Sequence, residues 1–373
     1  MEVFLLETYY TGSHKQWIDG YKNFSKHKIK ILSMIGQFWK WRMHGGAVTL
    51  AKRFNKMKCN PDIILCSDML DLTTFLSLTR TKTNNIPIAI YFHENQLSYP
   101  WSPKDRDKMN NRDAHYSFIN YSSALSADYV FFNSRFHMNS FLTDLKPFLK
   151  HFPDYNEIET IDTIRQKSEV LNIGLDLKKF DKYEEENHSK PLILWNHRWE
   201  YDKNPELFFD TLKLIKKNNH DFDLVVLGEN FNQNPQVFDQ AKKIFEENII
   251  HWGFAKSFNT YAKWLWKASI LPVTSNQEFF GISTIEAIYC NTFPILPNRL
   301  SYPELIPNKF HKMIIYNNKN NLYEKIVWAI KNHNKLQQYN FKLFTNQYDW
   351  KNMAPVYDKR LTSLYNKGIK KKY

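Results

Sequence analysis

The sequence predicts an α/β protein built from two parallel-sheet domains, and three observations support that fold class. The chain has 373 residues, more than a single hydrophobic core usually accommodates. Its hydrophobic content of 43% is ample for two such cores. Short β-rich runs alternate with helical patterns, as in consecutive βα units. The alternation is interrupted at residues 181–191, a polar and acidic stretch that ends at Pro191, and then restarts.

Each β-rich run is short, and a polar or amphipathic stretch follows it. The runs before the interruption are Val3–Leu6, Ile29–Leu32, Asp62–Cys66, Ile86–Phe92, Tyr129–Asn133 and Ser168–Ile173. The runs after it are Leu192–Trp195, Asp223–Leu227, Asn248–Trp252, Ser269–Val273, Phe293–Leu296 and Lys312–Tyr316. We therefore expect an N-terminal domain over residues 1–185 and a C-terminal domain over residues 186–373. The C-terminal helix is expected to pack back on the N-terminal domain.

Two helices can be predicted in detail. Asn204 suits the N-cap position of one helix, and Pro205 suits its first helical position. The first helix of the chain follows Gly12, and Ser13 can cap it. In that helix Trp17, Tyr21 and Phe24 recur at spacings of four and three, which places them on one buried face.

The charge of the chain favours an anionic partner. Lys and Arg total 51 against 38 Asp and Glu, a net charge of +13. Up to residue 188 there are 25 basic and 22 acidic residues, and after it 26 and 16, so most of the excess lies in the second half. The chain closes with Lys370, Lys371 and Lys372, which can serve either as a solubilising tail or as an RNA contact.

Cysteine usage and hydropathy exclude several classes of protein. The three cysteines form no C-x-x-C pair, so neither a disulfide scaffold nor a zinc site is indicated. The N-terminus lacks the features of a signal peptide, and every apolar run is far shorter than the roughly 20 residues that span a bilayer. We expect a cytoplasmic protein without integral membrane insertion.

The densest polar motif runs from Glu278 to Glu286. It follows the run Ser269–Val273 and opens a helix, with Gly281 at the strand-to-helix turn. At such a turn the backbone can approach a ligand, the helix N–H groups attract anions, and carboxylates can accept hydrogen bonds from sugar hydroxyls. This pattern indicates a nucleotide-sugar site. The alternative is that Glu286 lies on a solvated helix face and Glu278 caps the helix.

A second motif lies in the loop after Leu192–Trp195, where Arg198 and Lys203 precede the helix that begins near Asn204. Ligands of α/β sheets bind in such loops. The two cations can neutralise a diphosphate, Arg198 as a bidentate fork and Lys203 as a point charge. The alternative is that both are merely exposed residues of a basic protein.

Two features stand out in the N-terminal half. The loop after the first strand places Gly12 at a strand-to-helix turn, but no G-x-G-x-x-G and no P-loop motif occurs, which disfavours NAD-dependent and P-loop chemistry. His93 follows the run Ile86–Phe92 directly, where it can orient a hydroxyl or shuttle a proton. The alternative is a structural histidine whose ring is hydrogen-bonded within a loop. No H-E-x-x-H motif is present, so a zinc protease is excluded.

Together, these motifs resemble those of retaining family 4 glycosyltransferases with the GT-B fold. The resemblance is carried by an E-x7-E motif at Glu278 and Glu286 and an R-x4-K motif at Arg198 and Lys203. It implies two Rossmann-like domains that face each other across a cleft, an acceptor-side N-terminal domain and a nucleotide-sugar-binding C-terminal domain. It also implies that Glu286 holds the ribose, Glu278 a hydroxyl of the donor sugar, and Arg198 with Lys203 the diphosphate.

The same resemblance implies roles for the remaining motif residues. His93 falls at the position of the acceptor-side catalytic histidine, alongside Glu278, Arg198 and Lys203 as catalytic residues. The other residues expected to bind the donor nucleotide sugar are Gly12, Ser13, His14, Phe279, Phe280 and Gly281.

Further segments are similar to a narrower family, the glycosyltransferase-like domain-containing proteins that include tRNA-queuosine α-mannosyltransferases. They are Gly12–Gln16, Tyr91–Pro100, Phe132–Ser134, His197–Glu200, His251–Gly253 and Glu278–Gly281, within a resemblance that covers residues 2–355. This chain lacks the long insert that some relatives carry before the second domain, and it has Thr11 where a second glycine is common. The resemblance implies GDP-mannose as donor, the cyclopentenediol of queuosine in a tRNA anticodon loop as acceptor, and retention of configuration.

No D-x-D segment stands out in a loop suited to a metal, since Asp105 and Asp107 lie in a charged run. We therefore expect metal-independent transfer, with protein cations in place of Mg²⁺. Two alternative functions stay open at this point. One is a glycosyltransferase that acts on a lipid or polysaccharide acceptor, and the other is a non-catalytic module that binds RNA or a nucleotide.

Overall fold

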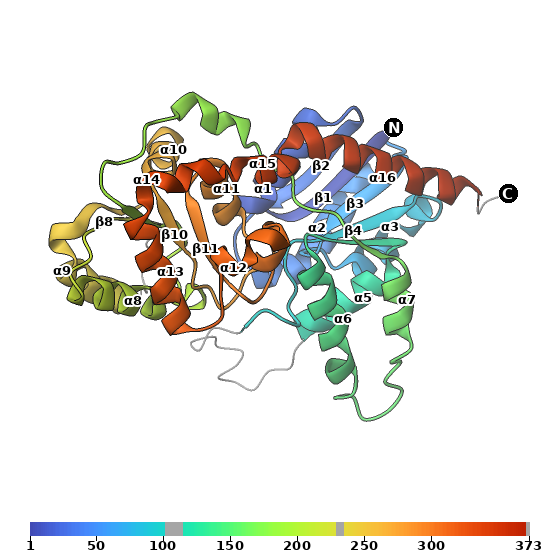
Figure 1. Ribbon diagram of the computed structural model, residues 1–373. Coiled ribbons are helices and arrows are strands. Elements are labelled where there is room, and N and C mark those ends of the chain that lie inside the picture. Colours follow the sequence, from blue (N-terminus) through green and yellow to red (C-terminus); the bar gives the residue numbers. More distant parts are fainter. Residues whose placement is uncertain (101–114, 229–234, 371–373) are drawn as a thin grey trace. The chain divides into compact units, whose positions relative to one another are not determined.

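The computed structural model describes residues 1–100, 115–228 and 235–370. The chain forms two compact units (Figure 1). Unit 1 consists of Met1–Leu175 together with Trp350–Tyr373, and unit 2 consists of Asp176–Asp349. The division falls between Leu175 and Asp176, before the boundary expected at residues 185–186, and the C-terminal helix belongs to unit 1.

Within the described residues, unit 1 contains a parallel sheet of six strands in the order β2-β1-β3-β4-β5-β6. The strands are β1 (Glu2–Tyr10), β2 (Lys28–Ile35), β3 (Ile63–Ser67), β4 (Ile88–Phe92), β5 (Tyr129–Phe132) and β6 (Ser168–Val170). The helices are α1 (Gly12–Phe24), α2 (Trp39–Lys56), α3 (Leu72–Thr83), α5 (His115–Ser126), α6 (Arg135–Leu149), α7 (Thr160–Gln166) and α16 (Trp350–Lys370). All the strands predicted for this half are present.

In unit 2, the described residues form a second parallel sheet of six strands, in the order β12-β11-β10-β7-β8-β9. The strands are β7 (Leu192–Trp195), β8 (Asp223–Leu227), β9 (Ile249–Gly253), β10 (Ile270–Pro272), β11 (Phe293–Pro297) and β12 (Ile315–Tyr316). The helices are α8 (Pro205–Lys217), α9 (Val237–Ile244), α10 (Phe258–Lys267), α11 (Ile282–Tyr289), α12 (His311–Ile314), α13 (Lys319–Lys331), α14 (His333–Leu336) and α15 (Lys342–Thr345). The strand predicted over Lys312–Tyr316 is wrong in its first part, which is helical.

The two helix starts that the sequence predicts have different outcomes. The start of α8 is confirmed, because Asn204 is its N-cap, Pro205 its first residue, and the Asn204 side chain accepts a hydrogen bond from Leu207 N at 3.3 Å. The cap proposed for α1 is wrong. That helix begins at Gly12, so Ser13 already lies in its first turn, and within the described chain Thr11 occupies the N-cap position without a side-chain cap bond.

The buried face of α1 is confirmed in part. Trp17 and Tyr21 are buried, whereas Phe24 at the end of the helix is only half-buried. Trp17 stacks on Tyr91 of β4, with their ring centroids 4.7 Å apart. The first helix therefore covers the middle of the sheet with its aromatic side chains.

Helix α16 packs against α1 in unit 1, and Figure 1 shows it in red among the blue and cyan elements of that unit. The Tyr357 hydroxyl donates to Asn172 O at 2.9 Å and accepts from Trp17 Nε1 at 3.1 Å. The Asp358 carboxylate accepts from the Tyr21 hydroxyl at 2.8 Å and from Ser25 Oγ at 2.6 Å. These buried polar contacts between distant parts of the chain hold the last helix in place.

Trp350, the first residue of α16, is buried between two glycines. Any Cβ atom at Gly20 or at Gly174 would overlap its indole. Glycine at these two positions therefore makes room for the indole. The packing of α16 on the rest of unit 1 depends on the absence of side chains there.

No helix among the described residues is both long and apolar enough to cross a membrane.

The close packing of Trp350 against Gly20 predicts the effect of Gly20→Ala. In an open helix interior this change would stabilise the protein by roughly 0.5–1 kcal/mol. Here the added methyl group overlaps the Trp350 indole, so we expect the free energy of unfolding to fall by about 1–3 kcal/mol instead. Urea unfolding followed by circular dichroism measures the change. Asn23→Ala on the exposed face of the same helix is the control, and a Gly20→Ala protein as stable as that control would contradict the packing.

Candidate active site

The strand order of unit 2 brings two distant loops together. From β7 the chain moves outward through β8 and β9, and then returns so that β10 pairs with the other side of β7. In open parallel sheets, ligands bind at such a reversal, beyond the carboxyl ends of the two strands. Residues 196–204 follow β7 and residues 273–281 follow β10. The two motifs that the sequence singled out therefore meet at one edge of one sheet.

Hydrogen bonds join the two loops directly. The Thr274 hydroxyl lies 2.9 Å from Lys203 O and 3.0 Å from Asn204 O. Asn276 N donates to Asp202 O at 2.7 Å. The loop after β10 thereby fixes the backbone of the loop after β7 just where the second of its two cations lies.

The Lys203 ammonium lies between the two loops. It donates to Gln277 O at 2.9 Å and pairs with Asp202 Oδ2 at 3.1 Å and Glu278 Oε2 at 3.5 Å. Lys203 is 8% exposed. Burial lowers its pKa, but Glu278 and Asp202 outweigh burial, and the pKa is raised overall. Lys203 is thus a permanently charged, positioned ammonium rather than an exposed lysine.

Arg198 differs from Lys203 in its exposure. Its side chain is 50% exposed, and its Nη2 lies 3.2 Å from Glu200 Oε2. Burial raises the pKa of the Glu200 carboxyl, and the positive charge of Arg198 opposes that shift. Arg198 also acts to lower the pKa of Lys203, so the two cations are close enough to interact. The loop offers one buried cation and one half-exposed cation.

The turn before α11 is formed by Gly281, which has a φ of +99° and is the N-cap of the helix. Because a side chain is disfavoured at this φ, glycine suits the turn. Capping of α11 by Glu278 is not observed, since Glu278 Oε1 instead accepts from Phe280 N at 3.4 Å. The side chains of Phe279 and Phe280 are buried. At these two positions it is the backbone that lines the turn.

Glu286 lies one helical turn into α11 and is half-buried. Its Oε2 accepts a hydrogen bond from the Tyr261 hydroxyl of α10 at 2.7 Å. Burial raises the pKa of Glu286, and Lys179 and Tyr261 oppose that shift. The alternative in which Glu286 lies on a solvated helix face is therefore wrong. Its carboxylate is oriented by a neighbouring helix, as a ligand-binding group would be.

Sequence reasoning missed two neutral polar side chains, those of Asn196 and His197, in the same loop as the two cations. Asn196 Nδ2 donates to Ser283 O at 2.7 Å, and His197 Nδ1 lies 3.1 Å from Ser283 Oγ. Burial, together with Lys203, lowers the pKa of His197 to about 3, so its ring is neutral. These contacts tie the loop after β7 to the first turn of α11. The position of Asn196 and His197 directly after a buried strand was the feature of the sequence that could have identified them.

A third loop also supports the site and was missed. Arg299, which follows β11, donates from Nε to Ser275 O at 3.0 Å and from Nη2 to Thr274 O at 2.7 Å. It thus braces the loop that carries Glu278. Nothing in its local sequence distinguishes Arg299, because its role depends on which strands are neighbours.

In unit 1, buried polar residues lie at the carboxyl ends of neighbouring strands β1, β3, β4 and β5. They are Glu7, Asp68, His93 and Asn133. His93 N donates to Asp68 Oδ1 at 2.8 Å, and Asn133 Nδ2 donates to His93 O at 2.8 Å. Side chains from the strands on either side therefore hold the backbone of His93.

The imidazole of His93 is buried among other rings. Its centroid lies 4.3 Å from that of His14, 4.6 Å from that of Trp17 and 4.9 Å from that of Tyr91. Neither of its nitrogens has a hydrogen-bond partner in the part of the chain that the structure describes. Burial lowers its pKa well below the usual value, with His14 and His137 contributing. The alternative of a hydrogen-bonded structural ring is therefore wrong, and a neutral ring without partners suits a ligand.

His14 of α1 is charged where His93 is neutral. Its Nδ1 donates to Oε2 of the fully buried Glu7 at 2.9 Å, and Glu7 Oε1 accepts from Tyr9 N at 2.7 Å. Burial lowers the pKa of His14, but Glu7 opposes burial and raises the pKa to about 9. An imidazolium thus lies next to the neutral His93.

The first turn of α1 begins with Gly12 and Ser13, both exposed. Gly12 has a φ of +50°, and no described atom lies within 4 Å of the place that its Cβ would occupy. Its conformation, and not lack of space, favours glycine. The start of the helix is thus open to a ligand next to His14.

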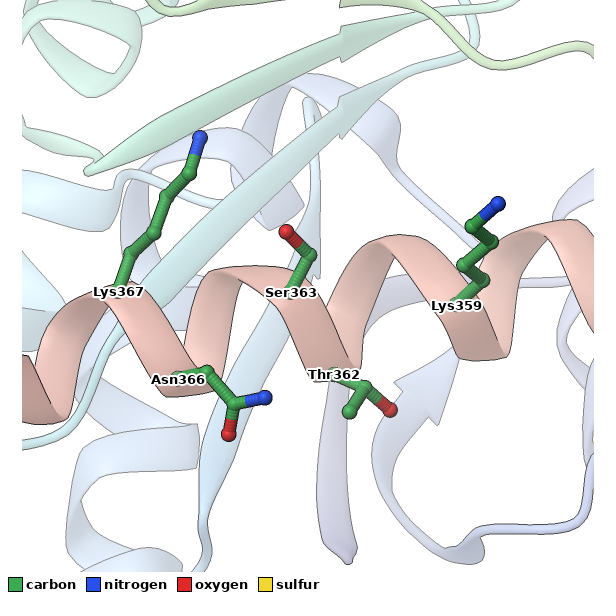
Figure 2. Close-up of a pocket in the computed structure, with 5 residues that line it drawn as sticks. All are labelled: Lys359, Thr362, Ser363, Asn366 and Lys367. Carbon is green, nitrogen blue, oxygen red and sulfur yellow. The ribbon is translucent and has the colours of Figure 1, made fainter.

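The structure adds two further observations on binding sites. Among the described residues, no group of three or more His, Cys, Asp or Glu side chains could hold a metal ion, and Asp105 and Asp107 lie outside those residues. Figure 2 shows a surface depression along α16, with Lys359, Ser363 and Lys367 pointing to one side of the helix. None of the residues predicted to bind a ligand lines it.

Comparisons with known proteins match most of both units. The family described as tRNA-queuosine alpha-mannosyltransferase N-terminal matches residues 2–175, and the family described as glycosyl transferases group 1 matches residues 177–342. The tRNA-queuosine alpha-mannosyltransferase of Drosophila melanogaster is 31% identical over 334 residues, which are 87% of this chain and 85% of that protein.

Solved structures show the same fold at low sequence identity. The catalytic domain of starch synthase IV from Arabidopsis thaliana, bound to ADP and acarbose, has a TM-score of 0.73 at 11% identity and covers 98% of this chain and 99% of its own. Sucrose-phosphate synthase from Thermosynechococcus elongatus has a TM-score of 0.70 at 11% identity and covers 98% of this chain and 100% of its own. The expected GT-B fold is confirmed.

The pKa of His14 predicts how stability depends on pH. Because its pKa rises from 6.5 to about 9 on folding, the stabilisation is complete below pH 6.5 and is lost as pH rises through about 9. We expect the free energy of unfolding to fall by about 3 kcal/mol over this range. Urea unfolding at several pH values measures the fall. In Glu7→Gln the neutral amide cannot stabilise the imidazolium, so the decrease in the free energy of unfolding with pH should largely disappear. An equal decrease in the wild type and in Glu7→Gln would refute the ion pair.

Proposed function

This chain belongs to the tRNA-queuosine alpha-mannosyltransferase family, and we propose that it transfers mannose from GDP-mannose, with retention, onto the cyclopentenediol of queuosine in a tRNA anticodon loop. Family membership supports hexosyl transfer to queuosine. A tRNA acceptor further favours a cytoplasmic location for the enzyme.

The observation that carries the proposal is the contact between Lys203 and Glu278 at the strand reversal of unit 2. A buried ammonium attracts a diphosphate far more strongly than an exposed one, because little water screens it. Arg198, half-exposed in the same loop, can add a bidentate contact to the phosphate oxygens. Glu278 can then accept a hydrogen bond from a hydroxyl of the donor sugar, and the oriented Glu286 from the ribose.

On the acceptor side, His93 is the group that we propose to orient the attacking hydroxyl. Its ring is neutral and both of its nitrogens lack partners among the described residues, so it can donate one hydrogen bond and accept another. His14 beside it carries the positive charge. A neutral ring next to a cation favours an uncharged or anionic group at this position.

The proposed reaction breaks the bond between the anomeric carbon and the diphosphate oxygen, and forms a bond from that carbon to a hydroxyl oxygen of queuosine. When the transfer takes place in a single step, retention requires attack on the face from which the diphosphate departs. The leaving phosphate then accepts the proton of the attacking hydroxyl. This route needs no pair of carboxylates placed across the sugar ring, as retaining glycosidases use. Lys203 and Arg198 stabilise the charge on the leaving diphosphate, which is why we propose metal-independent transfer.

Mass spectrometry of nucleosides tests this function. The purified enzyme is incubated with tRNA that contains queuosine and with GDP-mannose, GDP-glucose, UDP-glucose or UDP-galactose. We expect a hexose on queuosine with GDP-mannose alone, and the same yield with EDTA as without it. Transfer from a UDP-sugar would overturn the donor, and transfer to a lipid or polysaccharide in place of tRNA would overturn the acceptor.

Substitutions at the strand reversal test the donor site. In Lys203→Ala and in Glu278→Ala we expect kcat to fall by at least about 100-fold, because a preorganised charge or donor-sugar contact is lost. Transfer rates measure the loss. The control is Lys213→Ala, which removes a partly exposed lysine from α8 that pairs with Asp210. Thermal unfolding verifies that each variant is folded, and near-normal turnover in both site variants would refute the assignment.

A further inference from the structure

A long acid-free segment lies in unit 1, although that half of the chain is nearly balanced in charge. Between Asp19 and Asp62 the sequence contains ten Lys or Arg residues and no Asp or Glu. The segment covers the last five residues of α1, all of β2 and all of α2. Basic residues without interspersed acids attract a polyanion, and mixed charges would not.

The end of β2, the loop before α2 and the first turn of α2 expose three large apolar side chains within seven residues. Ile35 is 73% exposed, Phe38 is 77% exposed and Trp41 is 63% exposed. Apolar side chains gathered at one place on a surface mark a site of interaction. Aromatic rings in a basic environment are the groups on which unpaired nucleic-acid bases stack.

The indole of Trp41 and the loop that carries Phe38 are held in place. A Cβ atom at Gly45 would lie 2.6 Å from Trp41 Cζ2. The indole therefore packs directly against the backbone of Gly45, where any larger residue would displace it. Phe38 has a φ of +52°, an uncommon value for a phenylalanine, and it is the N-cap of α2. Arg42 Nε donates to Ile35 O at 3.0 Å and closes the loop. A rigid aromatic side chain loses little entropy when a base stacks on it.

Behind Trp41, the outer face of α2 carries cations. Val48, Lys52 and Lys56 follow Trp41 at spacings that place them on the same exposed stripe of the helix. The stripe is about 22 Å long, from 15 residues at 1.5 Å each. Within residues 1–100, 115–228 and 235–370, no salt bridge involves Lys52 or Lys56. Their charges are not neutralised there.

The loop before α2 also connects to the candidate acceptor site of unit 1. A Cβ atom at Gly36 would overlap Thr11 Cγ2, so this loop touches the turn that begins α1. Three residues further along that turn, the His14 ring lies 4.3 Å from that of His93. The exposed rings of the loop before α2 and His93, whose ring nitrogens have no hydrogen-bond partner among the described residues, thus share one edge of the sheet.

From these observations we infer that the α2 surface, formed by Ile35, Phe38, Trp41, Arg42, Lys52 and Lys56, is where unit 1 binds the anticodon arm of the acceptor RNA. Unpaired bases stack on Trp41 and Phe38, and phosphates follow Lys52 and Lys56 along the helix. The inference rests on the proposed function. It moves the RNA contact from the C-terminal lysines, where the charge count favoured it, to the N-terminal half.

A membrane fits this surface less well than RNA. The apolar face of α2, which includes Met43, Leu50 and Phe54, is buried in unit 1. A helix that binds a bilayer presents its apolar face to the lipid. Only Trp41 and Val48 give its exposed stripe any apolar character, and cations occupy the rest.

Fluorescence anisotropy with a labelled anticodon stem-loop, in the absence of any sugar donor, tests the inference. We expect the Kd of the full-length protein for this RNA to rise about tenfold in Trp41→Ala and in Phe38→Ala, since each loses one stacked base. Gly45→Ala should raise it similarly by displacing the indole, and Trp41→Phe should restore part of the affinity. Tyr155→Ala, which removes an aromatic ring 87% exposed elsewhere on unit 1, should leave the Kd unchanged.

Salt dependence tests the phosphate contacts. The double substitution Lys52→Gln and Lys56→Gln should reduce the slope of log Kd against log salt by about two. The matched control is Lys359→Gln with Lys367→Gln on α16. A loss of affinity in the α16 pair with none in Trp41→Ala would overturn the inference, as would liposome binding that depends on Trp41 while RNA binding does not.

The outcome separates this inference from the proposed function. If the wild type binds the stem-loop through Trp41 but transfers no hexose to tRNA, the function fails and the surface stands. If the wild type modifies tRNA and Trp41→Ala binds and modifies it as well as the wild type, the surface fails and the function stands. The melting temperature of each variant establishes that it is folded, and we expect it to be close to the melting temperature of Tyr155→Ala.

Discussion

In unit 2, the Lys203 ammonium is buried among oxygens of Asp202, Gln277 and Glu278, which come from two loops that the sequence separates by some seventy residues. A buried charge is tolerated only when it is paired and hydrogen-bonded, so the two loops must keep this arrangement for the unit to be stable. The same requirement fixes a positive charge at the strand reversal, where ligands of parallel sheets bind. One interaction therefore serves both the fold and the donor site.

Unit 1 also contains a buried charge that is paired, in this case with a histidine. The buried carboxylate of Glu7 pairs with the His14 imidazolium, and His93 next to it stays neutral. Two adjacent buried rings thus hold different charges, because only that of His14 has a carboxylate at hydrogen-bond distance. Such a separation of pKa values within a small region is typical of functional sites. The backbone bonds from Asp68 and Asn133 keep His93 at the edge of the sheet where this pair lies.

Much of this organisation could be predicted from the sequence. The β-rich runs predicted the strands well because a parallel strand buried on both faces needs a short apolar segment, which local composition reveals. The start of α8 was predictable because Asn204 and Pro205 act on their own helix. Predictions were poorer where a neighbour decides the local structure. Ser13 can cap a helix, but α1 begins one residue earlier, and residues 311–314 form a helical turn instead of the start of β12.

The sequence alone determined the fold class, the two parallel sheets and the identity of the charged motifs, since each depends on local patterns of apolar and charged residues. Only the tertiary structure decided which motifs meet. The order of the strands places β10 beside β7, and with it Glu278 beside Lys203 and Arg299 beneath the same loop. It also decided that the rings of Phe38 and Trp41 stay exposed while those of Phe279 and Phe280 are buried. Local sequence does not distinguish these aromatic residues, because burial depends on what the rest of the chain packs against them.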